Sequence, residues 1–388
     1  MRSVRRLALG RLISLMGGSA AYIALIATLY EETGSAAWVS AALFAGVVGS
    51  VVGAPGAGYI GDRLDRRRVL VGTDVVSAAV AGSMALVVDE PAALVGLFGL
   101  LAVVTSPFAP ASAAAMPNLV DAEEEVARAN ALVAATTSVG YLLGPLAGGL
   151  LLGAGVSAPS LFVLDAVSFL VSAAFVLSIR RSFGAGRGTS SHPGVLAGVR
   201  LIRREPLLRL LIVASMTSLL GMGIVNVAAY PLSLGLGGGT EGYGAMEALL
   251  GGGGLLGAAI AGRLLTTGNA TTVIGLSYAA SGVGLAVAGA APVLAVALVG
   301  MALAGGGRGL GEVADTTLIQ ARTQDAVRSR VFAAEEAAAH VAFSAAMLVG
   351  GLLVEAGGSR AAIGAAAACG LLAAVIASRM RRLQLAAA

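Results

Sequence analysis

Several ionisable residues lie inside long apolar runs of this 388-residue chain, where a charge costs free energy. Glu336 and His340 are four residues apart, so on a helix they would share one face. A carboxylate and an imidazole placed in this way could carry a proton, or could form a structural pair. The full set of candidate proton carriers is Glu335, Glu336, His340, Asp165 and Glu247.

The other three candidates have plainer alternatives. Asp165 and Glu247 lie only about one turn inside their apolar runs, so both could simply reach the lipid headgroups. Glu335 lies near one end of its run and has the same alternative. One cysteine and one histidine inside apolar runs cannot build a metal cluster, and the sequence predicts neither a metal nor a cofactor.

A second group of polar side chains could line a substrate cavity. Tyr22, Asn226 and Tyr230 are uncharged, which suits a hydrophobic, neutral or cationic compound better than a polyanion. Arg308 could contact a substrate anion. It is also four residues from Glu312, so the two could form an internal salt bridge instead.

These residues can be positioned only by helices that cross a membrane. The chain is 57% hydrophobic and 12% charged, about half the charge of a soluble protein. A transmembrane helix needs about 20 mostly apolar residues. The apolar runs predict twelve spans, at 9–30, 37–60, 69–88, 92–116, 129–152, 160–179, 209–232, 243–264, 271–290, 293–311, 331–353 and 361–379.

The arginines predict the orientation of the spans. The chain contains no lysine, and every arginine except Arg360 lies at a cytoplasmic end if the N-terminus is inside. Both termini are therefore predicted to be cytoplasmic, in a multi-pass protein of the cell (inner or plasma) membrane. The absence of lysine excludes a phosphate-binding loop of the ATPase type. The arginines are spread between apolar runs and do not form one basic face, so nucleic acid is not a predicted partner.

The chain divides into two halves that resemble each other. A polar cytoplasmic linker at 181–205, with a short amphipathic part, separates residues 1–180 from residues 206–388. The Arg-Leu pair of residues 61–64 recurs in residues 261–264, and Arg128 and Arg330 each precede a span at a similar offset. This near-constant offset indicates a duplicated six-helix unit. Transporters built from parallel repeats bind substrate at the interface between them.

A charged motif follows the second span and consists of Gly58, Asp62, Arg63, Asp65, Arg66 and Arg67. A carboxylate at the end of a helix can face the positive end of a neighbouring helix, so the motif could act as a gate. Its arginines could pair with the acids at 123–125. Alternatively, the arginines only fix the orientation of the chain.

A glycine motif lies in the fifth span and consists of Gly140, Gly144, Pro145, Gly148 and Gly149. Three of its glycines are four residues apart on one helix face, so another helix can approach closely. Pro145 removes one backbone donor and favours a kink. The motif is therefore either a packing surface or a hinge that also blocks proton leak.

The charged motif resembles the loop 2–3 signature of the major facilitator superfamily, with Asp65 where many members have Gly. Residues 117–132 and 320–332 are similar to the macrolide-efflux and enterobactin-exporter-like branch, and residues 140–149 resemble its antiporter motif. The resemblance implies two six-helix bundles around a central cavity. It also implies that Asp62 contacts the eleventh helix when the inner gate closes.

The predicted protein is thus an all-α integral membrane protein of twelve helices, and not an enzyme. It is expected to act as a monomer in the lipid bilayer and to exchange protons for an amphipathic drug, secondary metabolite or siderophore, which it exports. A proton-independent facilitator or importer remains an alternative, and proton dependence of transport in vesicles separates the two. A non-transporting membrane binding partner is a third possibility, supported only if no substrate moves.

Overall fold

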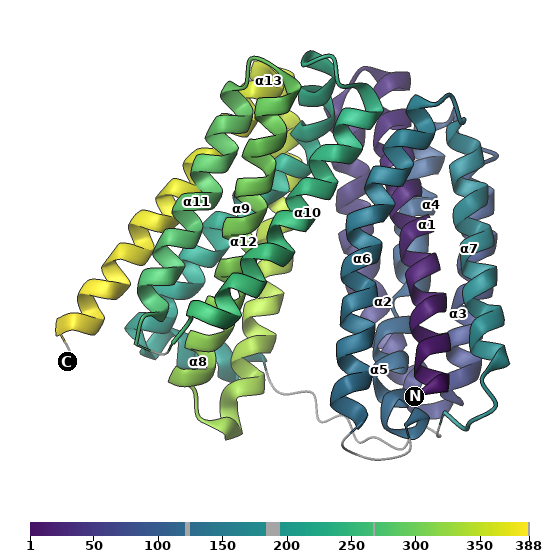
Figure 1. The fold of residues 1–388 in the computed structure, drawn as a ribbon, viewed down its shortest axis with the longest axis horizontal. Helices are drawn as coiled ribbons and strands as arrows, with labels where there is room; N and C mark the ends of the chain where they lie inside the picture. Colours follow the sequence, from purple (N-terminus) through teal and green to yellow (C-terminus); the bar gives the residue numbers. More distant parts are fainter. Residues whose placement is uncertain (121–124, 184–194, 267, 387–388) are drawn as a thin grey trace. The chain divides into compact units, whose positions relative to one another are not determined.

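A computed structural model describes residues 1–120, 125–183, 195–266 and 268–386. The side chains of residues 55, 57–63, 127, 195–198, 325–326, 329 and 384–386 lie outside the described part. Within the described ranges, every regular element is a helix (Figure 1). The helices before residue 184 are α1 (Arg2–Thr33), α2 (Ala36–Arg63), α3 (Arg66–Met84), α4 (Pro91–Thr105), α5 (Phe108–Leu119), α6 (Glu125–Gly153) and α7 (Ala158–Ser178). Those after residue 194 are α8 (Val195–Arg204), α9 (Pro206–Gly235), α10 (Gly239–Leu264), α11 (Ala270–Ala290), α12 (Leu294–Arg322) and α13 (Asp325–Ala386).

The described helices account for the twelve predicted spans. Among the described residues, ten helical segments are long and apolar enough to cross a membrane. One of them, in α13, contains two spans because Gly358 interrupts the helix with a φ of 78°. The remaining span is α3, whose 19 residues would extend about 28 Å. Three arginines at its start and a buried Asp74 lower its hydropathy.

Two predicted spans differ from the observed helices. The fourth span consists of two helices, α4 and α5, which are separated at Ser106 and Pro107. Proline lacks the N–H that a continuous helix needs, so it begins a new helix more readily than it continues one. The tenth span was predicted to end at residue 311, but α12 continues to Arg322. Its final turns carry a buried face of Ala314, Asp315, Leu318 and Ile319, so the helix continues to pack against its neighbours beyond the predicted end.

The chain forms two compact units, residues Met1–Ser190 and Ser191–Ala388. In the first unit, α1 packs against α6 and α7, α2 packs against α4, and α3 packs against α7. In the second unit, α9 packs against α13, α10 packs against α12, and α11 packs against both α12 and α13. The short helix α8 covers the part of the linker that was predicted to be amphipathic.

The same close helix contact occurs once in each unit. Gly49 and Gly53 of α2 pack against the backbone of α4, and Gly253 and Gly257 of α10 pack against the backbone of α12. A Cβ added to any of the four would collide with a carbonyl oxygen across the interface. Only glycine allows these backbones to approach. The glycines of α10 follow those of α2 by 204 residues, one helical turn more than the 61–64 and 261–264 match.

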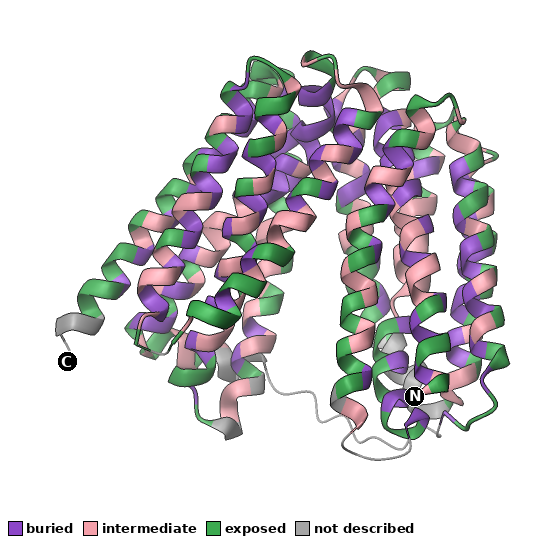
Figure 2. Cartoon of the chain, viewed as in Figure 1, coloured by how far each residue is buried: buried purple, intermediate pink, exposed green. Residues whose placement is uncertain are grey.

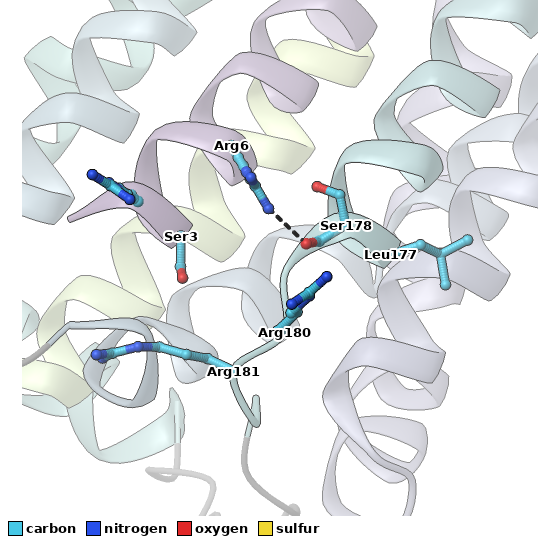
Figure 3. Close-up of a pocket in the computed structure, with 7 residues that line it drawn as sticks. Ser3, Arg6, Leu177, Ser178, Arg180 and Arg181 are labelled. Carbon is cyan, nitrogen blue, oxygen red and sulfur yellow. Dashed lines mark hydrogen bonds between the residues drawn. The ribbon is translucent and has the colours of Figure 1, made fainter.

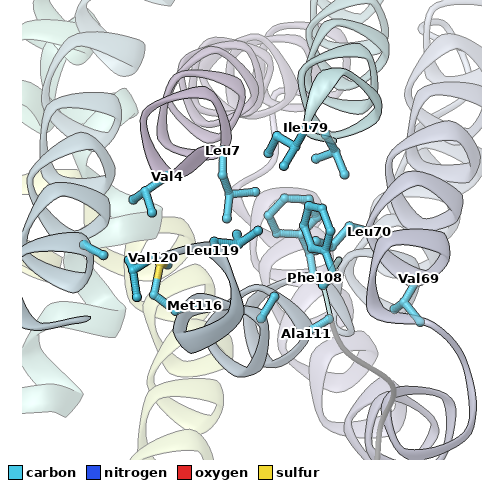
Figure 4. Packing of buried hydrophobic residues seen from close by; sticks show 14 residues of the cluster. Val4, Leu7, Val69, Leu70, Phe108, Ala111, Met116, Leu119, Val120 and Ile179 are labelled. Carbon is cyan, nitrogen blue, oxygen red and sulfur yellow. The ribbon is translucent and has the colours of Figure 1, made fainter. Parts of the chain in front are cut away.

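Each unit buries part of the surface of most of its helices and leaves large apolar side chains exposed (Figure 2). In the first unit, Val4, Leu7, Phe108, Leu119 and Ile179 belong to one buried cluster near the N-terminus (Figure 4). Apolar side chains that remain exposed on a membrane protein contact lipid tails, so they do not need a protein partner.

Candidate functional site

The charged loop between α2 and α3 is held by its own side chains. The carboxylate of Asp65 caps α3, because its Oδ1 accepts the backbone N–H groups of Arg67 at 3.0 Å and Arg68 at 3.2 Å. An N-cap carboxylate satisfies donors that the first helical turn leaves unpaired. This capping explains an aspartate at the position where many members of the resembled family have glycine.

Two arginines of the motif, Arg66 and Arg67 at the start of α3, contact carbonyl oxygens. Arg66 donates to the Ala114 oxygen at 2.8 Å and to the Phe183 oxygen at 3.3 Å. Arg67 donates to the carbonyl oxygen of Leu177 at the end of α7. A cation at a helix C-terminus is favoured by the unpaired carbonyls there.

Some of the predicted gate residues are not covered by the described structure. The burial of Gly58 and the side chains of Asp62 and Arg63 lie outside the described part, as do residues 121–124. The remaining predicted acid, Glu125, lies 3.9 Å from the N-terminal amine of Met1. The role of Asp62 as a gate therefore stays a prediction.

Removing the cap of α3 is expected to destabilise the protein. Asp65→Ala leaves two backbone donors of α3 unsatisfied, and we expect a loss of about 1 kcal/mol of unfolding free energy. Asp65→Asn keeps a side-chain oxygen as acceptor and should retain most of that stability. Thermal unfolding of the purified variants measures the difference. Equal losses for both variants would show that the charge, and not the cap, matters.

The glycine motif of α6 forms a close contact with α1. A Cβ added to Gly144 would lie 2.5 Å from the Ser19 Cβ, and one added to Gly148 would lie 2.7 Å from the Ala20 Cα. At Gly140, the Leu15 Cβ would be 2.8 Å away. Pro145 and Gly149 are both buried, and α6 is one helix through the proline. The packing function of this motif is evident, whereas a hinge remains a prediction.

Glu336 and His340 do not form a carboxylate–imidazole pair. The Nδ1 atom of His340 lies 2.8 Å from the backbone oxygen of Glu336, one turn earlier in α13. Both side chains are exposed. The neighbouring Glu335 is half-buried, and its charge acts on Glu312 and Asp315 of α12. Glu335 therefore lies near a buried carboxyl group, that of Asp315.

Asp165 and Glu247 both lie within their units. Asp165 is 1% exposed, and its Oδ1 accepts a hydrogen bond from Ser168 at 3.2 Å, so it does not reach the headgroups. Glu247 of α10 lies within electrostatic range of Arg308 on α12. No ion pair joins Arg308 to Glu312 in the described chain, although the two are four residues apart.

The predicted cavity residues have different environments. Tyr230 is fully buried, and its ring makes an edge contact with Tyr243 at a centroid distance of 5.4 Å. Asn226 donates from Nδ2 to the Met222 oxygen of its own helix at 2.8 Å. Tyr22 is half-buried in α1. The contacts of Tyr230 are therefore those of a core residue of the second unit.

The second unit also contains a buried polar pair that the sequence analysis did not identify. Tyr278 of α11 donates from its hydroxyl to Oδ2 of Asp315 of α12 at 2.7 Å. The two side chains are 5% and 7% exposed. Oδ1 of Asp315 is buried and has no hydrogen-bond partner among the described residues. Ser215 of α9 lies beside both groups.

The charges that act on Asp315 are negative. They belong to Glu335 and Glu312, and no cation acts on this carboxyl among the described residues. The sequence analysis missed Asp315 because it ended the tenth span at the charged Arg308 and Glu312. The small and apolar residues Ala304, Gly311 and Leu318 continue with helical spacing past those charges, which is the signal that could have extended the span.

At the positions of the first unit that correspond to Tyr278 and Ser215, the chain has an acid, Asp74, and a cation, Arg11. Asp74 of α3 is 1% exposed and lies within electrostatic range of Arg11 of α1. The Arg11 guanidinium lies 4.9 Å from the centre of the Phe108 ring. Asp74 and Tyr278 are 204 residues apart, as are Arg11 and Ser215. Among the described residues, the buried acid Asp74 of the first unit thus has a cation within electrostatic range, whereas the charges that act on Asp315 of the second unit are negative.

No cluster of three or more metal-ligating side chains is present in the described part of the chain. Repeated units of membrane-crossing helices, with ionisable groups buried inside them, are the architecture of many secondary transporters. The chain belongs to the Major Facilitator Superfamily, whose sequence model matches residues 7–334. Its fold, its family and its relationship to efflux proteins agree with the sequence analysis.

Two curated relatives are named for export. The chain is 27% identical over 340 residues to the "Putative bacilysin exporter BacE" of Bacillus subtilis (strain 168), covering 84% of this chain and 82% of the relative. It is 31% identical over 147 residues to macrolide efflux protein A of Streptococcus pyogenes, covering 37% and 36% of the two chains.

Solved structures show the same fold at low identity. The nucleoside transporter NupG aligns with a TM-score of 0.80 at 13% identity, over 98% of this chain and 99% of its own. A bacterial homologue of the iron transporter ferroportin aligns with a TM-score of 0.76 at 16% identity, over 98% of both chains. Identities this low support the fold and say nothing of the substrate.

Proposed function

We propose that this protein exports a small amphipathic molecule, such as a drug, secondary metabolite or siderophore, in exchange for protons. The direction is supported by a relative named as an exporter, which matches most of both chains. Alternating access would move the predicted bundles 1–180 and 206–388 about the linker, in a cell membrane with both termini in the cytoplasm.

The observation that carries the coupling is the carboxyl of Asp315. It is buried among α9, α11 and α12 and accepts a hydrogen bond from Tyr278, and the charges that act on it among the described residues are those of acids. A carboxylate without a partner of opposite charge has a high free energy in a medium that lacks water. Uptake of a proton removes this charge, and its release restores the charge. Asp315 can therefore couple proton movement to a change of conformation.

Glu335 is proposed as the group that exchanges protons with Asp315. It is half-buried on α13, and its charge acts on Asp315. Glu336 and His340 follow along the same helix and could extend the path. The proposal places the proton route in the second unit. In the first unit, Asp74 lies within electrostatic range of a cation, Arg11.

The test is substrate accumulation in cells that lack their own efflux pumps. Wild type and Asp62→Asn would be compared for dyes, macrolides and siderophores, with and without an uncoupler. We expect wild type to lower accumulation, and we expect both the uncoupler and Asp62→Asn to remove that effect. Asp89→Asn is the matched control, because it makes the same chemical change in an exposed turn between α3 and α4.

Other outcomes identify the alternatives. Flux that ignores the uncoupler would contradict antiport and favour a proton-independent facilitator or importer. An absence of flux for every compound, at normal expression, would favour a non-transporting membrane partner. Full activity of Asp62→Asn would remove the proposed gate.

A further inference from the structure

A basic pocket lies between the N-terminal end of α1 and the C-terminal end of α7, at the end of the first unit that is predicted to be cytoplasmic. Its volume is about 580 Å³. Figure 3 shows Ser3 and Arg6 of α1 beside Ser178 and Arg180 at the end of α7. The residues that line the pocket are Arg2, Ser3, Arg6, Leu177, Ser178, Arg180 and Arg181.

Two arginines of the pocket are held by the protein. Arg6 donates from Nη1 to the Ser178 oxygen at 2.7 Å, although the two residues are 172 positions apart. Arg181 donates from Nη1 to the Val120 oxygen at 2.8 Å. Each bond uses one of the five donors of a guanidinium, so the other donors remain for a ligand. The pocket therefore has a fixed cationic frame.

The other two arginines are available for a ligand. Arg2 and Arg180 are exposed, and within the described chain neither has a hydrogen bond or an ion pair. None of the described residues that line the pocket is acidic. Four guanidinium groups around one hollow make a site for an anion, and phosphate oxygens suit the planar fork of arginine.

We propose that this pocket binds the phosphate headgroup of an anionic phospholipid of the phosphatidylglycerol or cardiolipin class. Basic pockets between transmembrane helices on the cytoplasmic side are suited to such headgroups. The apolar side chains of Leu177 and Leu9 are 55% and 45% exposed near this end of the unit, so they can contact acyl chains. A soluble phosphate would use the arginines but not these leucines. The adjoining apolar surface therefore favours a lipid.

The pocket has more structure than an orientation signal requires. A bias of positive charge sets topology through loops near the ends of the spans, and it needs no shared site. Here arginines from the start of α1 and from the segment after α7 converge, and a hydrogen bond between Arg6 and Ser178 joins the two helices. A headgroup bound between these segments would link the first and sixth spans of the unit.

Lipid binding to the purified, delipidated full chain tests the proposal. Native mass spectrometry would compare short-chain phosphatidylglycerol with phosphatidylcholine for wild type and for the double variant Arg2→Gln and Arg180→Gln. We expect wild type to prefer phosphatidylglycerol, and we expect its affinity to fall about fivefold for each arginine removed. A lysine version of the double variant keeps the charge but not the fork, and should fall in between.

The control is Arg381→Gln with Arg382→Gln, which removes the same charge from exposed positions near the end of α13. The proposal fails if this control loses as much affinity as the pocket variant, or if the pocket variant binds like wild type. Displacement of the lipid by inorganic phosphate at matched phosphate concentration would reassign the pocket to a soluble anion. Because the assay needs no transport, its result is independent of the proposed export.

Discussion

Asp315→Asn is expected to reduce uncoupler-sensitive export to the level of cells without the transporter. Asparagine has nearly the shape of aspartate and can still accept the hydrogen bond from Tyr278, so the packing of α11 and α12 should survive. Unlike a carboxyl group, its amide neither loses nor gains a proton at the pH of the cell. The variant would therefore hold the site permanently neutral.

A second assay separates loss of coupling from loss of the protein. In vesicles with equal pH on both sides, exchange of labelled for unlabelled substrate needs binding and movement but no net proton transfer. We expect Asp315→Asn to retain this exchange while it loses accumulation driven by a pH gradient. The control Asp89→Asn should retain both activities, because its carboxylate is exposed outside the helices.

The variant Tyr278→Phe tests separately how the hydrogen bond to Asp315 affects coupling. It keeps the carboxyl of Asp315 and removes the hydroxyl that donates to it, so it leaves Asp315 with one partner fewer. We expect this variant to keep uncoupler-sensitive export, and we expect the pH dependence of that export to shift relative to wild type. If Asp315→Asn still exports in an uncoupler-sensitive manner at the wild-type rate, the proton site lies elsewhere in the chain.

Gly257→Val is expected to prevent the second unit from folding correctly. A Cβ at this position would collide with the backbone oxygen of Gly306, and backbone of α12 cannot rotate away as a side chain can. Overpacking of a well-packed site costs about 1–3 kcal/mol, and a clash with backbone belongs at or above the upper end. The helices α10 and α12 would have to separate, with loss of the contacts made by Gly253 and Gly309 as well.

The matched control lies on the same helix. Gly262 of α10 has no atom within 4 Å of an added Cβ, so Gly262→Val makes the same chemical change in open space. Yield of monodisperse protein and midpoint of thermal unfolding would be measured for both variants. We expect a large loss for Gly257→Val and a small change for Gly262→Val. Similar values for the two would mean that helix propensity, and not the interface, explains the effect.

The positions of the membrane spans could be predicted from the sequence, because hydropathy is a local property of about 20 residues. The boundary between the ninth and tenth spans was marked only by a short turn near Pro292. The helices nevertheless end at Ala290 and begin at Leu294. The close-packing face of Gly140, Gly144 and Gly148 could also be predicted, because residues four apart on a helix share a face.

The partners of the polar groups could not be predicted in the same way. Asp165 was placed one turn from the membrane surface, yet it is buried against α1 beside Ser168. Arg308 lies within range of Glu247 on another helix, although Glu312 has the spacing of a partner on its own helix. Depth along a span is a property of the sequence. The direction in which a side chain points depends on how its helix is rotated against its neighbours.

The sequence by itself determined that this chain crosses a membrane repeatedly, that it contains a duplicated unit, and that it carries the loop motif of its superfamily. The first two properties follow from composition and from the spacing of residues along the chain, and the third follows from a resemblance of the loop motif to the superfamily's signature. Only the tertiary structure decided that Tyr278 meets Asp315 and that Arg6 meets Ser178, across 37 and 172 residues of chain. Contacts of this kind arise when helices distant in sequence pack together. Each arginine or aspartate then takes the partner that the packing brings within reach.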